Sequence, residues 1–386
     1  MFDEKSHSLK MDKSIEAFSK ELSSLRTGRA NSAMLDLVKV DVYGQQMPIN
    51  QIGSITTPEP RMINIQVWDQ NNVTLVDSAI KKSELGLNPQ IDGQLIRLPV
   101  PNLSEERRIK IEEKVNETLT KAYKILNDGG TSMDAVEFVV SEFEDSPLFN
   151  AGKGSVYNSN EVQEMDASIM NGKDRSAGAV ASVRNIKNPI KLARKVSELT
   201  EHIMLVGDGA HEFAKNIGET IVDSEYFYSE KNLKRLKKAK DKLVSSNIIH
   251  DKIGTVGAVA IDKNGNIAAA TSTGGMTNKM PGRVGDSPII GSGTWAQNGV
   301  CGVSTTGHGE FFIKYQVARE VCVRMEYMNK SISDSSKEIL MELKQINAYG
   351  GLIAIDSEAN ISMPFNTHGM IRGSVSNKTN INVAIY

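Results

Sequence analysis

Apolar residues recur with two different spacings along the chain, and each spacing predicts a type of secondary structure. Ile15, Phe18, Leu22 and Leu25 are three or four residues apart, which is typical of one face of an amphipathic helix. Short apolar runs bounded by polar turns come next and predict strands, namely VKVDVYG, INQIGSITT, RMINIQVWD and QLIRLPV. A helical pattern, VTLVDSAIKKSEL, precedes the last of these runs. The patterns predict an N-terminal helix followed by a small β-rich domain.

The pattern then changes to a long helix and, further along, to a hairpin. SEERR near residue 104 begins a helical pattern that continues to Asn127. Small and β-branched residues flank Asn264-Gly265, which is a turn signal between two strands. Folding the chain there sets Thr255 opposite residue 273 or 274, with Cβ atoms roughly 5 Å apart. A change of one residue in register would turn the two threonine hydroxyls to opposite faces.

Several long motifs around this hairpin resemble the plant-type asparaginase and isoaspartyl peptidase family, whose members are N-terminal-nucleophile (Ntn) hydrolases. The motifs are DGGTSMDAVEFVV, SPLFNAGKGSVY and EMDASIMNG before the hairpin, and TTGHGE and GLIAIDSEANISMPFNTHGM after it. They occur in the family's order over about residues 112–386. The resemblance implies an αββα Ntn-hydrolase sandwich, with an α segment over 112–254 and a β segment over 255–386.

The resemblance also implies that Thr255 is a nucleophile. A threonine hydroxyl is a poor nucleophile until a base takes its proton, and in this class the base is the threonine's own α-amino group. That amine titrates at about pH 7.7 to 8.0 in reference peptides, which suits general-base work. It exists only after self-cleavage between Gly254 and Thr255. Gly254 favours this step because it lacks a Cβ and tolerates unusual backbone angles beside the attacking oxygen.

The family's other site residues carry over onto matching positions. Thr273 would orient the nucleophile, and Thr306 and Gly307 would form an oxyanion hole from a hydroxyl and a backbone N–H. Arg283 and Asp286 would hold the substrate's α-carboxylate and α-ammonium groups. A guanidinium fork fits a carboxylate through two hydrogen bonds, and an aspartate complements a cation.

Two loops complete the implied site. Gly309 closes the oxyanion loop, and Asn150 in SPLFNAGK is expected to line the active site. His308 stands where the family usually has another residue, and it receives no catalytic role. The loop 144–153 resembles one whose backbone carbonyls bind a structural sodium ion, whereas no cofactor or metal is expected in catalysis. Packing of a polar loop is the competing interpretation for Asn150 and for the sodium loop.

Each of these residues has a plainer interpretation when it is taken alone. A threonine at the start of a strand is usually structural. An arginine or aspartate in a glycine-rich loop is usually a solvated turn residue. The joint match of several motifs favours the family assignment over these alternatives.

The first 110 residues resemble another family, bacterial ribosome recycling factor. The matching motifs are SLRTGRANSAML, VDVYGQQMPINQ, LGLNPQIDGQLIRLPVP and LSEERR. That family inserts its β-rich domain into a helical arm, and here the resemblance ends by about residue 112, before the arm is complete. A single amphipathic helix cannot bury its apolar stripe alone. Arg26 and Arg29 would contact ribosomal RNA phosphates, with solvated arginines as the alternative.

The hydrolase part also departs from its family, because no HGGAG-type sequence occurs in the chain. Family members begin with a strand that ends in such a loop near the self-cleavage site, and its absence puts the activity of this chain in question. The two resemblances, each of which lacks part of its family's fold, thus meet near residue 110. Such a junction favours a fusion of two genes over a bifunctional design. A ribosome-binding protein with an inert passenger, or an inactive fusion, is the alternative to a working hydrolase.

Composition and charge narrow the remaining possibilities. The net charge of −2 argues against a protein that electrostatics steers to nucleic acid. Cys301 and Cys322 are the only cysteines, so neither a disulfide framework nor a zinc site is expected. No apolar run approaches the roughly 18 residues that span a bilayer, and the charged N-terminus carries no secretory signal, so a cytoplasmic location is expected. The basic run KNLKRLKKAKDK over 231–242 is interpreted as a solvated linker, with an RNA-binding patch as the alternative.

The sequence therefore predicts an α/β protein, in which an Ntn-hydrolase sandwich follows an α+β fragment. The expected segments are an N-terminal helix over 1–30, a β-rich domain over 31–103, a junction helix over 104–127, and the α and β segments over 112–254 and 255–386. The expected reaction is hydrolysis of L-asparagine or of β-aspartyl dipeptides through a β-aspartyl-threonine ester. The expected partners are that substrate and, from the resemblance, a second αβ unit in a homodimer, without a membrane. Ribosome contact belongs to the alternative.

Overall fold

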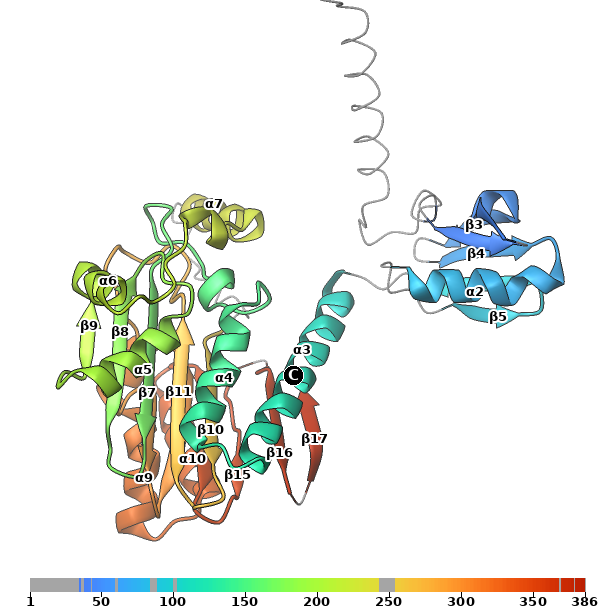
Figure 1. The fold of residues 1–386 in the computed structure, drawn as a ribbon. Coiled ribbons are helices and arrows are strands. Elements are labelled where there is room, and N and C mark those ends of the chain that lie inside the picture. The colour runs from blue at the N-terminus through green and yellow to red at the C-terminus, as the bar shows by residue number, and fades with distance from the viewer. Residues whose placement is uncertain are drawn as a thin grey trace, which may run out of the picture. The chain divides into compact units, whose positions relative to one another are not determined.

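The computed structural model describes residues 35, 38–42, 44–59, 62–83, 89–99, 103–242, 254–367, 369–377 and 379–385. The chain divides into two compact units, Met1–Lys110 and Ile111–Tyr386, and each has its own apolar core. Figure 1 colours the first unit blue and the second from green to red. The helix expected over 1–30, with Arg26 and Arg29, lies outside the described residues.

The first unit contains a four-stranded antiparallel sheet in the order β3-β4-β6-β5, together with the hairpin β1-β2. Its elements are β1 (Lys39–Val42), β2 (Gln45–Pro48), β3 (Gly53–Glu59), β4 (Met62–Val67), α2 (Val73–Lys82), β5 (Gln90–Asp92) and β6 (Leu95–Pro99). Side chains alternate along β4, so Ile63 and Ile65 are buried. They share one core with Val76 and Ile80, which lie one helical turn apart on α2. The patterns of the sequence predict β1, β3, β4, β6 and α2 correctly, whereas the short strands β2 and β5 lie outside the predicted runs.

Helix α3 (Leu103–Asn127) occupies the stretch where the sequence predicts a helix over 104–127. Ile111, Val115 and Ala122 of α3 are buried in the core of the second unit. Gly129, with a φ of 92°, follows the end of the helix, and the N–H of Gly130 donates to the carbonyl of Ile125 at 2.9 Å. Glycine is favoured there because a side chain would strain the left-handed backbone that ends the helix.

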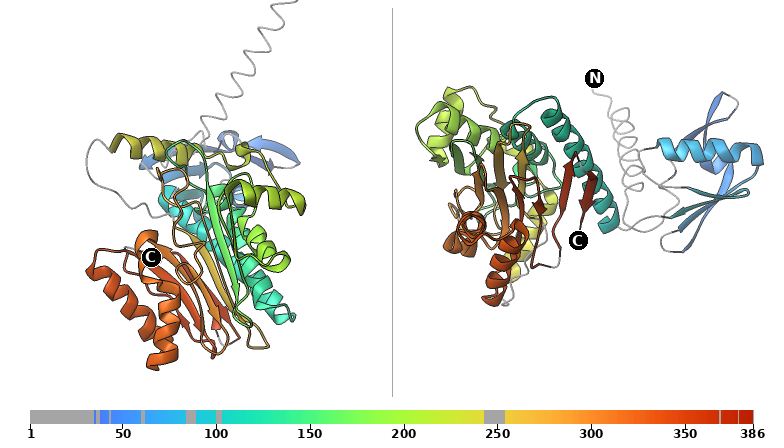
Figure 2. Two further views of the ribbon diagram at one scale, coloured as in Figure 1. Left: turned by 90° about the vertical axis from the view of Figure 1, so that its left-hand side faces the viewer. Right: turned by 90° about the horizontal axis from the view of Figure 1, so that it is seen from below.

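The second unit is a sandwich of two stacked sheets with helices on both outer faces, which confirms the predicted αββα fold (Figure 1). The first sheet has the order β10-β11-β7-β8-β9 and carries α4, α5 and α6 on its outer face. The second has the order β12-β13-β14-β15 and carries α9 and α10. The left view of Figure 2 shows these layers edge-on, with α9 and α10 in orange.

The first-sheet elements are α4 (Ser132–Glu144), β7 (Met165–Asn171), β8 (Ala177–Val183), α5 (Pro189–Leu199), β9 (Met204–Val206), α6 (Gly207–Asn216), β10 (Val256–Ile261) and β11 (Ile267–Thr273). The second-sheet elements are β12 (Thr294–Gln297), β13 (Cys301–Gly307), α8 (Gly309–Tyr315), α9 (Val317–Met328), α10 (Ile332–Gln345), β14 (Gly350–Asp356) and β15 (Ile361–Ser362). A C-terminal hairpin, β16 (Arg372–Ser376) and β17 (Thr379–Ala384), lies beside α3. Within the described residues, no helix is long and apolar enough to cross a bilayer.

The two cysteines are paired. Cys301 at the start of β13 and Cys322 in α9 form a disulfide, with Cα atoms 5.9 Å apart. The sequence argument against a disulfide is therefore wrong for this pair. It failed because α9 packs directly on β13, and this tertiary contact joins residues that are 21 positions apart.

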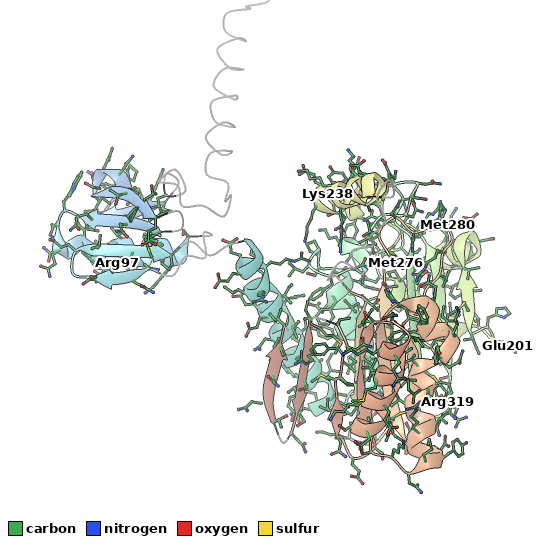
Figure 3. The ribbon with its side chains drawn as sticks, turned by 180° about the vertical axis from the view of Figure 1, so that it is seen from behind. Arg97, Glu201, Lys238, Met276, Met280 and Arg319 are labelled. Atoms are coloured by element: carbon green, nitrogen blue, oxygen red, sulfur yellow. A yellow bond between two sulfur atoms is a disulfide. The ribbon has the colours of Figure 1, made fainter. Side chains whose placement is uncertain are left out.

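The basic run also differs from its interpretation as a linker, since it forms helix α7 (Glu230–Lys242). Leu236 is fully buried, and the side-chain amide of Asn232 donates to the carbonyls of Gly154 and Ser155 at 2.9 and 3.1 Å. Asn232 and Leu236 are four residues apart, so they share the inner face of the helix. Lys238 lies on its exposed side (Figure 3).

A buried carboxyl joins three elements of the first sheet and its helices. Glu144, the last residue of α4, is fully buried, and its Oε1 accepts hydrogen bonds from the Ser272 hydroxyl at 2.6 Å and the Ile190 N–H at 3.0 Å. Burial raises the pKa of the Glu144 carboxyl to about 8. The folded protein therefore holds this group protonated near neutral pH.

Replacing Glu144 by glutamine should make the free energy of unfolding less dependent on pH. In the wild type the unfolded chain releases this proton above about pH 4.5 and the folded chain only above about pH 8, so stability falls between these values. The expected loss is up to about 1.4 kcal/mol per pH unit, and a glutamine, which keeps the acceptor oxygen, avoids it. Urea unfolding at pH 5 and pH 8 measures the difference. Glu142→Gln is the control, because Glu142 lies on the same helix but is only half-buried and pairs with Lys114 at 2.6 Å. Equal pH dependence in E144Q and wild type would refute the argument.

Candidate functional site

The β10–β11 hairpin brings two of the predicted threonines together. The strands pair antiparallel with Val256 opposite Ser272, so the next pair outward is Thr255 and Thr273. The Thr255 hydroxyl donates a hydrogen bond to Thr273 Oγ1 at 3.1 Å. The prediction that residue 255 faces residue 273 or 274 is confirmed, and both hydroxyls lie on the same face of the sheet.

The second sheet brings a third threonine to the same point. A Cβ atom built on Gly254 would lie 3.1 Å from Thr306 Oγ1, so this hydroxyl is beside the Gly254–Thr255 peptide bond. Gly307 follows as the exposed last residue of β13. The nucleophile expected at Thr255 and the oxyanion donors expected at Thr306 and Gly307 therefore meet at one end of the sandwich.

The two residues expected to bind the substrate's amino-acid end also lie together. A Cβ atom on Gly309 would be 2.9 Å from Arg283 Nη2 and 3.0 Å from Asp286 Oδ1, so both charged groups converge on this glycine. Asp286 is buried, and its Oδ2 accepts a hydrogen bond from the Thr305 hydroxyl at 2.7 Å. The arrangement presents a cation and an anion beside Gly309, as recognition of a free amino-acid end requires.

Burial affects the charge of Asp286, and an ion pair holds the charged group of Arg283. Burial raises the pKa of the Asp286 carboxyl to about 6, while the Thr305 hydrogen bond and the Arg283 charge oppose the shift. Arg283 is 17% exposed and pairs with the more exposed Glu310, whose Oε1 is 2.9 Å from both Nε and Nη2 of the guanidinium. Arg283 is therefore held along one edge.

Asn150 is held by the loops around it. Its side-chain amide donates to the carbonyl of Gly275 at 2.7 Å, and its Oδ1 accepts from the N–H of Val156 at 3.1 Å. Its backbone carbonyl accepts from Gly274 at 3.0 Å. Asn150 thus supports the Gly274–Gly275 turn directly after Thr273, a contact that the alternative of polar loop packing anticipates.

Two buried charges near this turn were not predicted. Asp166 pairs with Thr273 across β7 and β11, and its Oδ1 accepts from the Ser182 N–H at 2.8 Å. Lys279 donates from Nζ to the carbonyl of Glu164 at 2.8 Å. Burial raises the pKa of Asp166 and lowers that of Lys279. Asp166 stands in the motif EMDASIMNG and Lys279 in the loop that follows Thr273, but a strand or loop pattern alone does not predict a buried charge.

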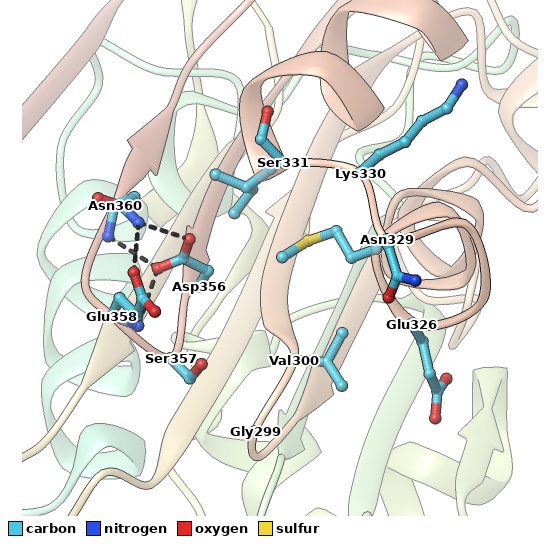
Figure 4. Close-up of a pocket in the computed structure, with 12 residues that line it drawn as sticks. Gly299, Val300, Glu326, Asn329, Lys330, Ser331, Asp356, Ser357, Glu358 and Asn360 are labelled. Atoms are coloured by element: carbon cyan, nitrogen blue, oxygen red, sulfur yellow. Dashed lines mark hydrogen bonds between the residues drawn. The ribbon is translucent and has the colours of Figure 1, made fainter.

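A separate pocket lies between the turn before β13, the end of α9 and the turn after β14 (Figure 4). It is lined by Gly299, Val300, Met325, Glu326, Asn329, Lys330, Ser331, Ile332, Asp356, Ser357, Glu358 and Asn360. The carboxylate of Asp356 is occupied by the side chain of Asn360 and by the N–H of Glu358. No predicted site residue lines this pocket. Across the part of the chain that the structure describes, no cluster of His, Cys, Asp and Glu side chains is arranged to hold a metal ion.

Comparison with known protein families identifies the larger part of the chain. Residues 92–385 match the model of the family described as Asparaginase. The chain belongs to the asparaginase family. Residues 18–129 match the model of the Ribosome recycling factor family, so the first unit from residue 18 and the whole of α3 are similar to that family. The two matches overlap over residues 92–129, which contain β6 and α3.

Individual asparaginase-family proteins are similar to this chain over most of their length. The isoaspartyl peptidase/L-asparaginase of Mus musculus is 48% identical, over 66% of this chain and 78% of that protein. The one of Bos taurus is 46% identical, over 66% of this chain and 83% of its own length. The isoaspartyl peptidase of Escherichia coli strain K12 is 42% identical, over 70% of this chain and 89% of that protein.

Replacing Thr273 by alanine should slow self-cleavage between Gly254 and Thr255 by roughly tenfold or more. The alanine removes the acceptor that holds the Thr255 hydroxyl at 3.1 Å, so the attacking oxygen is no longer fixed. Thr273→Ser keeps the hydroxyl and should cleave at close to the wild-type rate. A pulse-chase experiment resolved on denaturing gels measures both rates, and wild-type cleavage in T273A would contradict this role.

Proposed function

We propose that this chain is a threonine-nucleophile amidohydrolase that cleaves itself between Gly254 and Thr255 and then hydrolyses L-asparagine, β-aspartyl dipeptides, or both. One observation carries the proposal: the Thr255 hydroxyl lies 3.1 Å from Thr273 Oγ1, with the Thr306 hydroxyl beside Gly254. The substrate class is supported by relatives whose names are isoaspartyl peptidase and L-asparaginase.

The first step of the proposal creates the catalytic base. Thr255 Oγ1 attacks the carbonyl carbon of Gly254, and its proton passes to the Thr255 nitrogen as the carbon–nitrogen bond breaks. The resulting ester between Gly254 and the Thr255 side chain is then hydrolysed by water, which leaves a carboxylate on Gly254 and a free α-amine on Thr255. The Thr306 hydroxyl, 3.1 Å from the position of a Cβ on Gly254, would donate to the oxyanion that forms on the Gly254 carbonyl.

The free amino acid or isoaspartyl residue is then held by its two charged groups. Arg283 donates to the α-carboxylate and Asp286 accepts from the α-ammonium, while Gly309 leaves room for both protein groups. A side chain at Gly309 would fill the space that the guanidinium and the carboxylate share. Binding therefore fixes the side-chain amide of the substrate relative to Thr255.

Hydrolysis follows in two stages. The α-amine of Thr255 takes the proton of its own hydroxyl, and Oγ1 attacks the side-chain amide carbon of the substrate. The tetrahedral oxyanion accepts hydrogen bonds from the Thr306 hydroxyl and the Gly307 N–H. The base then returns the proton to the leaving nitrogen, which departs as ammonia or as the amine of a peptide. Water attacks the β-aspartyl-threonine ester, releases aspartate and restores the nucleophile.

The purified chain should migrate as two fragments, 1–254 and 255–386, and release ammonia and aspartate from asparagine. Thr255→Ala should stay as one band and lose activity, because it has no hydroxyl for either attack. A denaturing gel with intact-mass analysis locates the cut, and an ammonia assay measures turnover. An uncut wild-type chain would contradict the proposal, since the α-amine of Thr255 would then not exist.

The dependence of kcat/KM on pH should show two ionisations. The Thr255 α-amine must be neutral, so activity falls about tenfold per pH unit below about pH 7.7. Asp286 becomes protonated below about pH 6 and loses its attraction for the ammonium, so the fall should steepen there to about a hundredfold per unit.

The control for this profile is Asp286→Asn, which cannot titrate. Its kcat/KM should be lower throughout, because the ammonium has lost its charged partner, and its acid limb should keep a slope of one. Initial rates with asparagine between pH 5 and pH 9 measure both profiles. A second break below pH 6 that persists in D286N would exclude Asp286 as its source.

A second candidate function rests on the match of residues 18–129 to ribosome recycling factor. The described part of the first unit has its own core around Ile63, Ile65 and Leu98, so it is a folded element that could contact a ribosome. Co-sedimentation of the whole chain with ribosomes tests this candidate. Recovery of the chain only in the supernatant would oppose it.

Three further properties form part of the proposal. A structural sodium ion would be held by backbone carbonyls of the loop 144–153, which is so tight that a Cβ on Gly152 would overlap the Glu144 carbonyl oxygen. Melting temperatures in sodium and tetramethylammonium salts would reveal such an ion.

The αβ units would form a homodimer, which light scattering measures. The location would be cytoplasmic, as fractionation of cells can test.

A further inference from the structure

Several carboxylates of the protein lie close to Arg283, although its predicted ligand is the carboxylate of the substrate. Asp286 Oδ1 and Arg283 Nη2 both lie about 3 Å from the position of a Cβ on Gly309. Glu310, the second residue of α8, adds another carboxylate, whose Oε1 is 2.9 Å from Nη2 of the guanidinium. The nearby charges include the buried Asp166 and Lys279, whose fields reach Arg283 or its partners. Arg283 therefore has more than one carboxylate nearby with which it could pair.

Arg283 and Asp286 have opposite charges, yet in the proposed function each must bind a different group of the substrate. If they paired directly, each would neutralise the other and both binding positions would be lost. Among the described residues, Arg283 forms its ion pair with Glu310 and not with Asp286. Asp286 instead accepts the Thr305 hydroxyl at 2.7 Å. Each of the two binding groups is thus held by a partner that keeps it apart from the other.

The geometry of the Glu310 contact leaves the end of the guanidinium available. Glu310 Oε1 takes the edge formed by Nε and Nη2, with both distances at 2.9 Å. Gly285 and Gly309 flank the guanidinium, and a Cβ at these positions would lie 2.8 Å from Nη1 and 2.9 Å from Nη2. A planar guanidinium carries five donors, so the edge contact still leaves the Nη1–Nη2 end for a second carboxylate.

We propose that Glu310 is a positioning residue for substrate recognition, which anchors the Nε–Nη2 edge of Arg283, keeps it from collapsing onto Asp286, and presents its Nη1–Nη2 end to the α-carboxylate. This inference rests on the proposed function for the identity of the ligand. Glu310 does not touch the reacting atoms. It acts by fixing a side chain whose freedom would otherwise have to be lost when the substrate binds.

The test is the affinity for L-aspartate, the product with both charged groups, measured by titration calorimetry on the whole chain. Glu310→Ala should weaken binding about tenfold, because Arg283 loses its anchor. Glu310→Gln should bind within about threefold of wild type, because its Oε1 accepts from the same two nitrogens. With asparagine as substrate, E310A should raise KM by a similar factor and leave kcat and self-cleavage unchanged.

A matched control is available on the outer helices. Glu342 is exposed to a similar extent as Glu310, 49% against 54%, and it also pairs with a largely buried arginine, Arg324, at 2.8 Å. Glu342→Ala should leave the affinity for L-aspartate unchanged, so it separates a local effect from the general loss of a surface ion pair.

Three results would overturn the inference: unchanged affinity in E310A, tighter binding in both variants, or equal losses in E310Q and E310A. Tighter binding would mean that Glu310 acts by repelling the ligand carboxylate, and equal losses would mean that its charge matters and its position does not. Because the affinity measurement needs no turnover, failure of the proposed hydrolysis is seen separately, as an uncut or inactive chain that still binds L-aspartate.

Discussion

The site depends on a chain of buried hydroxyl groups that fixes one sheet against the other. Ser168 on β7 donates to Thr294 on β12 at 2.8 Å, and Thr294 donates to Thr271 on β11 at 2.6 Å. Thr271 in turn shares a 2.7 Å hydrogen bond with Ser304 on β13. Buried hydroxyls are costly without partners, so sliding one sheet over the other would break several bonds at once. Thr273 and Thr306 each lie two residues further along the last two strands.

Close approach of the sheets is possible because glycines stand where they touch. A Cβ on Gly257 would overlap the hydroxyl of Ser304, and one on Gly302 would come within 2.7 Å of the Ile267 side chain. The hydroxyl chain sets the lateral position and these glycines set the spacing. Together they place the end of β13 beside the start of β10, which is why Thr306 reaches Gly254. The site is thus a consequence of sheet packing and not of any single loop.

The sequence predicts the parts of this arrangement that are local. A turn at Asn264-Gly265 fixes the register of its own hairpin, so the neighbourhood of Thr255 and Thr273 follows from counting residues. The position of Thr306 depends on contact between two sheets, which no local pattern contains, and only resemblance to a family supplied it. The same limit explains the unexpected disulfide, because helix packing on β13 pairs Cys301 with Cys322. In α7 the many lysine and arginine residues made the run look fully solvated. Its buried face consists of few residues, among them Asn232 and Leu236, so it is hard to recognise in the sequence.

Three buried ionisable residues surround the predicted site. Burial favours the neutral form of each group, so it raises the pKa of Asp286 and Asp166 and lowers that of Lys279. Keeping these groups charged therefore costs folding free energy. Groups with such pKa shifts cluster at functional sites, where catalysis and binding depend on them. Lys279 lies against Gly275 and Asp166 lies opposite Thr273, so these two residues lie on either side of the turn that follows Thr273. Within the segment from Thr273 to Asp286, Lys279 donates to the Glu164 carbonyl and Asp286 accepts from the Thr305 hydroxyl. These bonds tie the segment to its surroundings, so they help to set the separation between Thr273 and the predicted substrate-binding groups.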